Sequence, residues 1–268
     1  MARAKRHYIP GYTWHITHRC HRGEHLLKFA RDRRRWIEWL YRAKKRYRGL
    51  SVLNYMVTSN HIHLIVSDSE GQYAIPDTIK LIAGRTAQEY NQRKKRKGAF
   101  WEDRYHATAI DSNRYLRQCI TYIDLNMVRA GVVGHPSEWE FCGYNEIQRP
   151  KRRKRIIDMG KLIQLLGFEN HTEFMEAHYN WVNNGLKDNP TERELKWTTS
   201  IAVGSKSYIE KIKRALVVKV KGRKIIKSNS SFELREKVQT FAQRGSIDPI
   251  NQFDWQSPGS IINRHFKP

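Results

Sequence analysis

The order of the predicted strands and helices constrains the fold of this 268-residue chain more than any other feature of its sequence. Runs rich in β-branched and aromatic residues predict strands at 9–17, 50–57, 61–66 and 100–110. Helical spacing of apolar residues predicts helices at 29–45, 75–94 and 112–130. Helices that alternate with an antiparallel-leaning sheet are typical of an α+β fold. We therefore expect a ferredoxin-like antiparallel sheet with helices on its faces.

The predicted helix 112–130 has the clearest periodicity. Its apolar residues recur at i, i+3, i+4, i+7 and i+11, which places them on one face. Ser112 is the predicted N-cap, and Gly131 is the predicted residue that ends the helix. The apolar positions are Leu116, Cys119, Ile120, Ile123 and Met127.

A run of five basic residues, 151–155, is the best candidate for a domain boundary. We predict a catalytic domain at 1–150 and a basic, mainly helical C-terminal extension at 151–268. Within the extension, two short helices joined by residues 202–205 are compatible with a helix-turn-helix-like unit. Ser207, followed three residues later by Glu210, predicts a capping box at the start of the second of these helices.

The formal net charge of +24 indicates what kind of partner the chain has. Nucleic acid is the leading candidate, because clustered Lys and Arg side chains neutralise phosphates and release counterions. An anionic membrane surface is the alternative, but no apolar run of about 18 residues predicts a membrane span. The N-terminal segment lacks the apolar core of a secretion signal. We expect a cytoplasmic, nucleoid-associated protein without membrane partners.

Cysteine usage agrees with this location. Cys20, Cys119 and Cys142 are an odd number at long spacing, which indicates neither a disulfide framework nor a zinc knuckle. Three small, partly buried thiols in a reducing compartment are the simplest interpretation.

The triplet His61-Ile62-His63 carries the first chemical signal. On a strand, residues i and i+2 point to the same face, so both imidazoles face one way while Ile62 faces the core. Two imidazoles on a rigid strand make half of a metal site. From ligand chemistry alone, zinc or manganese is the expected ion, because Mg²⁺ prefers oxygen ligands.

Tyr122 and Asn126 supply the second signal, because residues four apart share a helix face. Helical-wheel geometry places this face outside the apolar stripe, so neither side chain is expected in the core. A metal held by His61, His63 and the Asn126 oxygen would place a phosphate beside the Tyr122 hydroxyl, which would act as the nucleophile. Tyr115 is the alternative nucleophile.

These residues lie within a series of motifs. The segment 59–66 reads Ser-Asn-His-Ile-His-Leu-Ile-Val, 100–105 reads Phe-Trp-Glu-Asp-Arg-Tyr, and 122–131 reads Tyr-Ile-Asp-Leu-Asn-Met-Val-Arg-Ala-Gly. In this order they resemble the single-tyrosine HUH transposases of the IS200-like class, and most closely the REP-associated tyrosine transposases. The segments 10–17 and 135–144 are similar to that branch too. The resemblance covers about residues 7–148, and 197–209 is similar to the C-terminal extension of longer members.

The resemblance implies a Mg²⁺- or Mn²⁺-dependent endonuclease and strand transferase that acts on single-stranded or hairpin DNA. It implies His61, His63 and Asn126 as metal ligands and Tyr122 as the nucleophile of a covalent 5′-phosphotyrosine intermediate. Met127 departs from the branch, which commonly has proline there, so the helix is expected to continue past Asn126. Relatives exist as monomers and as homodimers, and either state is compatible with this sequence.

Basic runs and aromatic residues predict the DNA-binding surface. A domesticated, non-catalytic protein that binds DNA or RNA hairpins is the alternative function, although it has no reason to keep all four site residues. The predicted DNA-binding residues are Tyr12, Trp14, Lys44, Lys45, Arg46, Arg93, Lys94, Lys95, Arg96, Arg104, Lys151, Arg152 and Arg153.

Overall fold

The centre of the protein is a four-stranded antiparallel sheet with the strand order β2-β3-β1-β4. The computed structural model describes residues 8–69, 73–150, 153–188, 193–216, 224–228 and 231–235. The strands are β1 (Thr13–Arg19), β2 (Leu50–Val57), β3 (His61–Asp68) and β4 (His106–Ile110). Helices α1 (Ala30–Arg46) and α2 (Ala74–Arg93) connect them in the order β1-α1-β2-β3-α2-β4. The predicted α+β, ferredoxin-like arrangement is therefore confirmed.

Three further strands from the C-terminal extension continue this sheet beyond β4. They are β5 (Ala202–Gly204), β6 (Lys224–Ser228) and β7 (Ser231–Arg235), in the order β4-β5-β7-β6. Strand β5 pairs with β4 in parallel, and the other two pairs are antiparallel. The predicted helix-turn-helix-like unit is wrong, because residues 202–204 satisfy their backbone groups in the sheet instead of forming a turn. The boundary at residue 151 stays a prediction.

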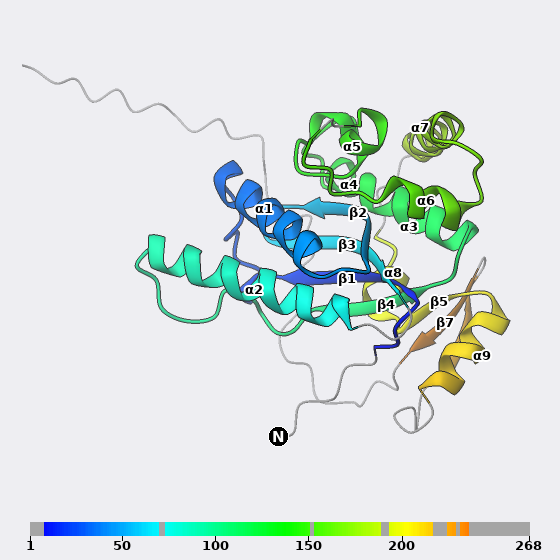
Figure 1. Cartoon of the computed structure of the whole chain (residues 1–268), viewed down its shortest axis with the longest axis horizontal. Coiled ribbons are helices and arrows are strands. Elements are labelled where there is room, and N and C mark those ends of the chain that lie inside the picture. The colour runs from blue at the N-terminus through cyan, green and yellow to red at the C-terminus, as the bar shows by residue number, and fades with distance from the viewer. Residues whose placement is uncertain are drawn as a thin grey trace, which may run out of the picture.

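Helices α1 and α2 pack against each other on one side of the sheet, as Figure 1 shows. Arg35 of α1 and Glu89 of α2 form a two-bond ion pair, with nitrogen–oxygen distances of 2.6 and 2.7 Å. The Trp101 indole nitrogen donates to the Ala83 carbonyl of α2, and its ring stacks on His18 of β1. These contacts identify the β1 face that carries His18 as the face covered by α2.

The opposite face is covered by α3 (Arg114–Asp124), α4 (Asn126–Arg129) and the segment around α8 (Lys196–Thr199). Figure 1 shows α3 grouped with α6 (Met159–Leu166) and α7 (His171–Lys187), away from α1 and α2. The remaining elements are η1 (His21–Gly23), η2 (Pro136–Glu138), α5 (Tyr144–Gln148) and α9 (Lys206–Ala215).

A buried hydrogen-bond network joins α3 to the extension. The Asp124 carboxylate accepts hydrogen bonds from Asn54 Nδ2 of β2 at 3.0 Å and from His178 Nε2 of α7 at 2.8 Å. The Gln148 amide lies 2.8 Å from His178 Nδ1 and occupies the other ring nitrogen. Because Asp124 and His178 are fully buried, these bonds fix α3 against both β2 and α7.

The predicted helix 112–130 is interrupted. Helix α3 ends at Asp124, Leu125 has a ψ of 2°, and α4 begins at Asn126. Continuation of one helix past Asn126 is therefore wrong, although the chain keeps turning in the same sense. Gly131, at φ 65°, ends this region as predicted. All five predicted apolar positions are buried.

Two predicted helix caps are wrong by one or two residues. Helix α3 is preceded by Asn113, and the backbone nitrogen of Ser112 bonds to the Asp111 carboxylate instead. In α9 the cap is Ser205, whose hydroxyl accepts from the Tyr208 backbone nitrogen, because β5 ends directly before it.

The three cysteines are buried and free, and no helix in the described ranges is long and apolar enough to cross a membrane.

Candidate active site

Strand β3 places His61 and His63 on one face, as predicted. Their ring centroids are 4.9 Å apart. His61 Nδ1 lies 2.7 Å from the Asn60 side-chain oxygen and 3.0 Å from the Thr58 hydroxyl. The Asn60 oxygen can only accept, so Nδ1 of His61 carries the ring proton and Nε2 keeps its lone pair. Burial, with a smaller contribution from the nearby Arg193 and Arg19 charges, lowers the pKa of His61 to about 3.

His63 is held by a residue that the sequence did not single out. His15 of β1 is fully buried, and its Nε2 lies 2.9 Å from Nδ1 of His63. The two rings are nearly parallel, with an interplanar angle of 12°. On its other side, His15 Nδ1 lies 2.9 Å from the backbone carbonyl oxygen of Trp197. Alternation along β1 could have placed His15 on the face of His63, but no local signal indicates its partner in the extension.

Asn126 reaches the same histidine from the helical side. Its amide nitrogen lies 3.2 Å from His63 Nε2. Rotation of the carboxamide by half a turn exchanges nitrogen and oxygen and would bring the oxygen to the same position. The structure thus brings together His61, His63 and Asn126, the three residues that were predicted as metal ligands.

Tyr122 completes the group. Its ring lies edge-on to His63, with centroids 6.1 Å apart, whereas Tyr115 lies two turns earlier at the start of α3. The expectation that Tyr122 lies outside the core is wrong, because the Trp197 ring covers it at 6.2 Å and leaves it 4% exposed. The predicted helix face was right, but a part of the chain remote in sequence buries it.

Two arginines determine the electrostatics around Tyr122. The Arg129 guanidinium carbon lies 4.1 Å from the ring centroid, and its Nη2 donates to the Tyr122 backbone carbonyl at 2.7 Å. Burial raises the pKa of the Tyr122 hydroxyl, and the positive charges of Arg129 and Arg193 act in the opposite direction. The arrangement therefore favours the phenolate more than burial alone would allow.

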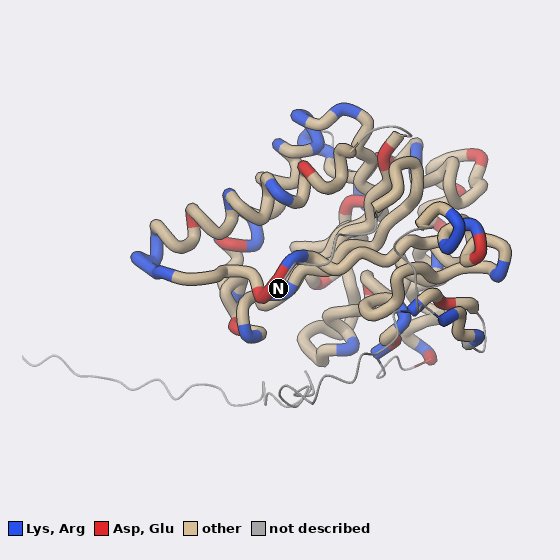
Figure 2. The backbone as a smooth tube through the Cα atoms, turned by 90° about the horizontal axis from the view of Figure 1, so that it is seen from below, with Lys and Arg blue, Asp and Glu red and all other residues tan. Residues whose placement is uncertain are grey.

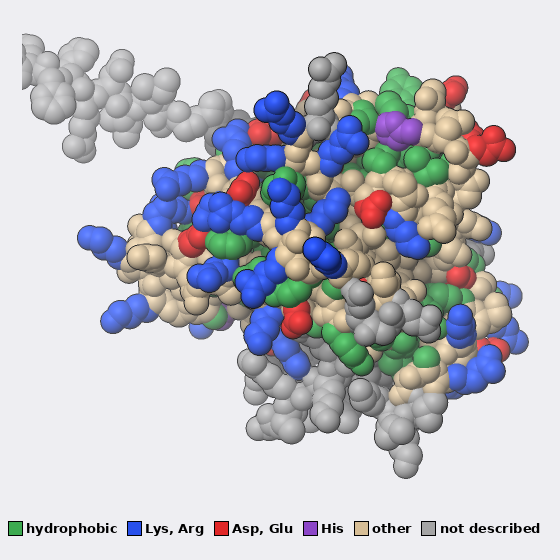
Figure 3. Space-filling view, viewed as in Figure 1, with side chains coloured by type: hydrophobic (Ala, Val, Ile, Leu, Met, Phe, Trp, Pro, Cys, Tyr) green, Lys and Arg blue, Asp and Glu red, His purple; other side chains and the backbone are tan. Residues whose placement is uncertain are grey.

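The predicted DNA-binding residues do not form one cluster. Lys94 and Lys95 are exposed directly after α2, and Lys45 and Arg46 are exposed in the last turn of α1, whereas the exposed Arg104 and Arg153 lie on neither helix. Figure 2 shows basic residues recurring along these two long helices, and Figure 3 shows their side chains gathered over this part of the surface. Figure 3 also shows acidic side chains between them, and three arginines of α1 pair with carboxylates: Arg34 with Glu140, Arg35 with Glu89 and Arg42 with Glu38. The remaining excess of positive charge suits contact with a phosphate backbone.

Several of these residues have structural partners. Trp14 is fully buried and donates its indole N–H to the Ile9 carbonyl, so its predicted role in stacking on a base is wrong. Lys44 donates to the Ile156 carbonyl at 2.8 Å, and Arg93 pairs with Asp32. Roles for the others stay predictions. Tyr12 lies beside Tyr208, and Arg96 lies 3.7 Å from Glu24. Lys45 lies over the Tyr41 ring, Arg46 lies over the Tyr47 ring, and Arg104 and Arg153 are exposed. Lys151 and Arg152 lie outside the described residues.

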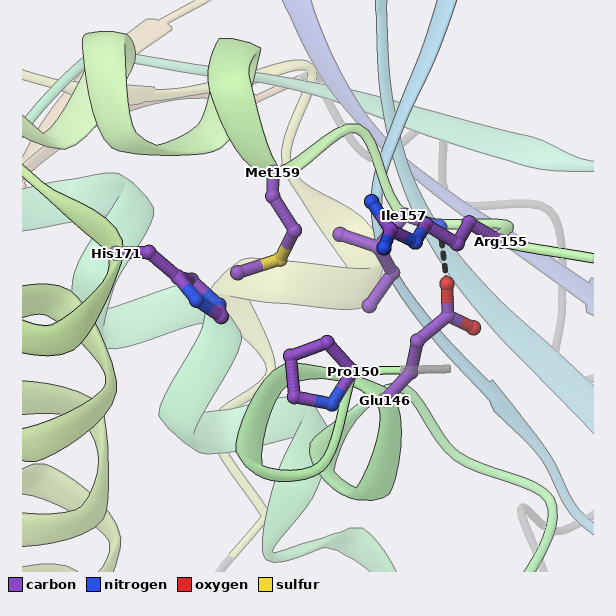
Figure 4. A pocket seen from close by; sticks show the side chains of 6 residues that line it. All are labelled: Glu146, Pro150, Arg155, Ile157, Met159 and His171. Atoms are coloured by element: carbon purple, nitrogen blue, oxygen red, sulfur yellow. Dashed lines mark hydrogen bonds between the residues drawn. The ribbon is translucent and has the colours of Figure 1, made fainter. Parts of the chain in front are cut away.

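A cavity of about 310 Å³ lies between α5, α6 and α7 and is not lined by His61 or His63. Figure 4 shows Glu146, His171 and Met159 around it. The Glu146 carboxylate accepts hydrogen bonds from the backbone nitrogens of Ile156 and Ile157 at 2.6 and 2.9 Å. This carboxylate is thus occupied in anchoring the start of the extension, and the cavity adds nothing to the site.

Comparison with known proteins gives a family match for part of the chain. Residues 9–126 match the family model described as IS200-like transposase, which confirms the predicted resemblance for this segment. No curated protein matches the chain.

The solved structures that are similar to this chain include the following two. One is a REP-associated tyrosine transposase bound to a REP hairpin, 22% identical, which covers 59% of this chain and 94% of its own with a TM-score of 0.46. The other is a candidate transposase from Deinococcus radiodurans, 18% identical, which covers 44% of this chain and 92% of its own with a TM-score of 0.32.

Proposed function

Residues 9–126 match the family model described as IS200-like transposase, and from that match we propose that this chain is a metal-dependent single-stranded DNA endonuclease and strand transferase. One observation supports the proposal most strongly. The Tyr122 ring lies edge-on to His63, with centroids 6.1 Å apart, and the Asn126 amide lies 3.2 Å from Nε2 of the same imidazole. The tyrosine side chain therefore lies beside the proposed ligand set, as a covalent tyrosine mechanism requires.

The residues present fit a divalent cation. In His61 and His63 the Nδ1 atoms are engaged by neighbours, which leaves the Nε2 lone pairs for a metal. Within the described ranges, no three His, Cys, Asp or Glu side chains form a group that could hold a metal, so we propose the Asn126 carboxamide oxygen as the third protein ligand. Phosphate and water oxygens would complete a set suited to Mg²⁺ or Mn²⁺. When bound, the ion would polarise the phosphate and align the scissile bond.

Tyr122 would perform the covalent step. Its hydroxyl oxygen forms a bond to phosphorus while the bond from phosphorus to the 3′ oxygen breaks. The phenolic proton passes to solvent, and the departing 3′ oxygen takes up a proton. The products are a 5′-phosphotyrosine and a 3′-hydroxyl. Because the phosphodiester energy is retained, a 3′-hydroxyl can attack the phosphotyrosine in reverse and join strands.

Arg129 would hold the developing charge on Tyr122. Its guanidinium lies over the phenol ring, and burial lowers the pKa of Arg129 itself, as expected for a cation inside a largely closed site. A phenolate beside Arg129 therefore pairs with a charge that is already in place, and little reorganisation is needed during attack.

The exposed basic surface of α1 and α2 would bind the DNA backbone. It lies on the opposite side of the sheet from His63, so DNA that contacts both must pass around an edge of the sheet. We propose hairpin DNA as the substrate, since a stem can occupy the basic surface while an unpaired strand enters the site.

The test is a denaturing-gel assay with end-labelled single-stranded hairpin DNA and Mg²⁺ or Mn²⁺. Wild type should give a metal-dependent protein–DNA adduct, and Tyr122→Phe should lose it by at least about 10³-fold. Tyr115→Phe is the matched control and should keep it. An adduct in Tyr122→Phe that disappears in Tyr115→Phe would overturn the assignment. Tight hairpin binding without cleavage by wild type would favour a domesticated binder.

A further inference from the structure

We propose that His15 and the backbone carbonyl of Trp197 form a positioning relay that fixes the ring proton of His63. Through this relay, the C-terminal extension holds Nε2 of His63 unprotonated and directed toward the metal site. The inference rests on the proposed function in one respect, which is that His63 is a metal ligand.

The relay follows from which atoms donate and which accept along the buried series of the Trp197 carbonyl, His15 and His63. A backbone carbonyl can only accept, so Nδ1 of His15 must donate to Trp197 at 2.9 Å. A neutral imidazole carries one ring proton, so Nε2 of His15 can then only accept. Its partner at 2.9 Å is Nδ1 of His63, which must therefore carry the proton. Nε2 of His63 is left with its lone pair.

The Asn126 side chain is compatible with this proton arrangement. Its amide nitrogen lies 3.2 Å from Nε2 of His63 and can donate to the lone pair there. Rotation of the carboxamide would replace this donor with the oxygen that we propose as a metal ligand, so the ring proton of His63 is assigned through His15 alone.

The Trp197 carbonyl is itself fixed by the sheet. The Thr108 hydroxyl of β4 lies 3.2 Å from this carbonyl and 2.7 Å from the Ser200 carbonyl. The Ser200 hydroxyl donates to the Glu233 carboxylate of β7 at 2.6 Å. Trp197 is therefore held near β4 by Thr108, and Ser200, which follows α8, is bonded to both β4 and β7.

Through Trp197, the extension contacts two residues of the site, His15 and Tyr122. Its carbonyl bonds to His15, and its ring lies 6.2 Å from the Tyr122 ring. Trp197 is fully buried, so solvent does not compete for the carbonyl. A shift of α8 would change both the ligand side and the nucleophile side of the site.

The first experiment reads the ring protons directly in the full-length, metal-free wild type. Long-range ¹H–¹⁵N correlation spectra of histidine-labelled protein at neutral pH should show His15 and His63 as Nδ1–H tautomers, with the His63 signals identified by their loss in His63→Gln. An Nε2–H tautomer at His63 would overturn the relay. This measurement requires neither metal nor DNA, so it decides the relay even if the proposed function fails.

The second experiment measures Mn²⁺ binding by the electron paramagnetic resonance signal of the free ion. His15→Phe should weaken binding about 10- to 100-fold, the usual effect of losing a residue that orients a ligand. His15→Gln keeps an acceptor for His63 and should stay within about 10-fold of wild type.

His18→Phe is the control, because His18 is a buried histidine of the same strand that points to the other face. It should bind Mn²⁺ as wild type does. Wild-type affinity in a folded His15→Phe would overturn the positioning role. Absence of Mn²⁺ binding by wild type would instead count against the proposed metal site, and the tautomer measurement would still decide the relay.

Discussion

Strands β1 and β3 present two faces, both covered by other parts of the chain, that differ in chemistry. The face toward α1 and α2 carries Ile16, Leu64 and Val66, which are almost fully buried and apolar, and its one histidine on these strands, His18, lies near the end of β1. The opposite face carries His15 and His63, which are as deeply buried but polar.

The difference shows how burial serves two purposes in one sheet. An apolar buried face stabilises the fold through the hydrophobic effect. Buried imidazoles contribute little of this, and each must be hydrogen-bonded to avoid a desolvation penalty. The polar face meets this condition with partners from β1, α4 and the extension, which is why it can keep unprotonated nitrogens available for chemistry.

The largest expected effect is the loss of DNA cleavage when a histidine of the polar face is replaced. His63→Gln removes the central ligand of the proposed metal site and the contact between His63 and Asn126. DNA cleavage should therefore fall by about 10³-fold or more. The melting temperature should change by only about 2–4 °C, the effect of about 1 kcal/mol in a chain of this size. Adduct yield and thermal denaturation check both parts.

His18→Gln is the matched control for that variant, since His18 lies on the α2 side of β1. It should cleave DNA as wild type does. Equal losses of cleavage in the two variants would show that the two faces are not functionally distinct.

A substitution on the apolar face should instead lower stability and leave DNA cleavage unchanged. Leu64→Ala should lower the free energy of unfolding by about 3 kcal/mol, because it leaves a cavity under α1 and α2. Cleavage per folded molecule should be unchanged. Urea denaturation measures the loss, and Leu195→Ala, at a leucine that is 53% exposed, is the control. Equal stability of the two variants would contradict the assignment of Leu64 to a stabilising core.

A smaller effect is expected at the exposed lysines that directly follow α2, one of the helices that cover the apolar face. Replacing Lys94, Lys95 and Lys97 together with alanine should weaken hairpin DNA binding and reduce the salt slope by about 2–3, because exposed lysines neutralise phosphates. Fluorescence anisotropy over a salt series measures both quantities.

Lys44→Met is the control for this surface, because the Lys44 ammonium already bonds to the Ile156 carbonyl. Its salt slope should match that of wild type. A slope that falls in the control but not in the triple variant would place the DNA elsewhere.

The smallest expected effect concerns Asp68, a carboxylate at the end of the apolar face. Burial raises the pKa of Asp68 from 3.8 to about 6, although its Oδ1 accepts a hydrogen bond from the Gly11 nitrogen at 3.1 Å. Because the folded pKa exceeds the unfolded one, folding favours the protonated acid. Its contribution to stability is therefore present below about pH 4 and is lost as the pH rises to about 6.

Asp68→Asn should consequently stabilise the protein by about 1 kcal/mol at pH 8, a value reduced from the full pKa shift because solvent reaches part of the group. The gain should vanish near pH 4. Denaturation at both pH values measures it, with Glu210→Gln at an exposed carboxylate as the control. The same pH dependence in both variants would contradict the role of burial at Asp68.

Much of the fold could be predicted because its signals are local. Period-2 alternation placed His61 and His63 on one face, and helical spacing gave α1, α2 and the apolar side of α3. The strands of the extension were not predicted, because β5 is short and pairs with a strand that lies about 90 positions earlier in the chain. Trp14 was misjudged for a similar reason, since an aromatic residue on a strand looks the same in sequence whether it faces solvent or core.

The sequence by itself determined the residue types of the site and their local spacing, because strand and helix periods depend only on the backbone. Only the tertiary structure decided that Tyr122 is buried, that His15 contacts His63, and which ring nitrogens keep their lone pairs. Those properties depend on hydrogen bonds and packing between distant segments, as between His15 and Trp197, which are 182 positions apart. The hydrogen-bond partners of an imidazole decide which ring nitrogen carries the proton, and these partners come together only when the sheet is assembled.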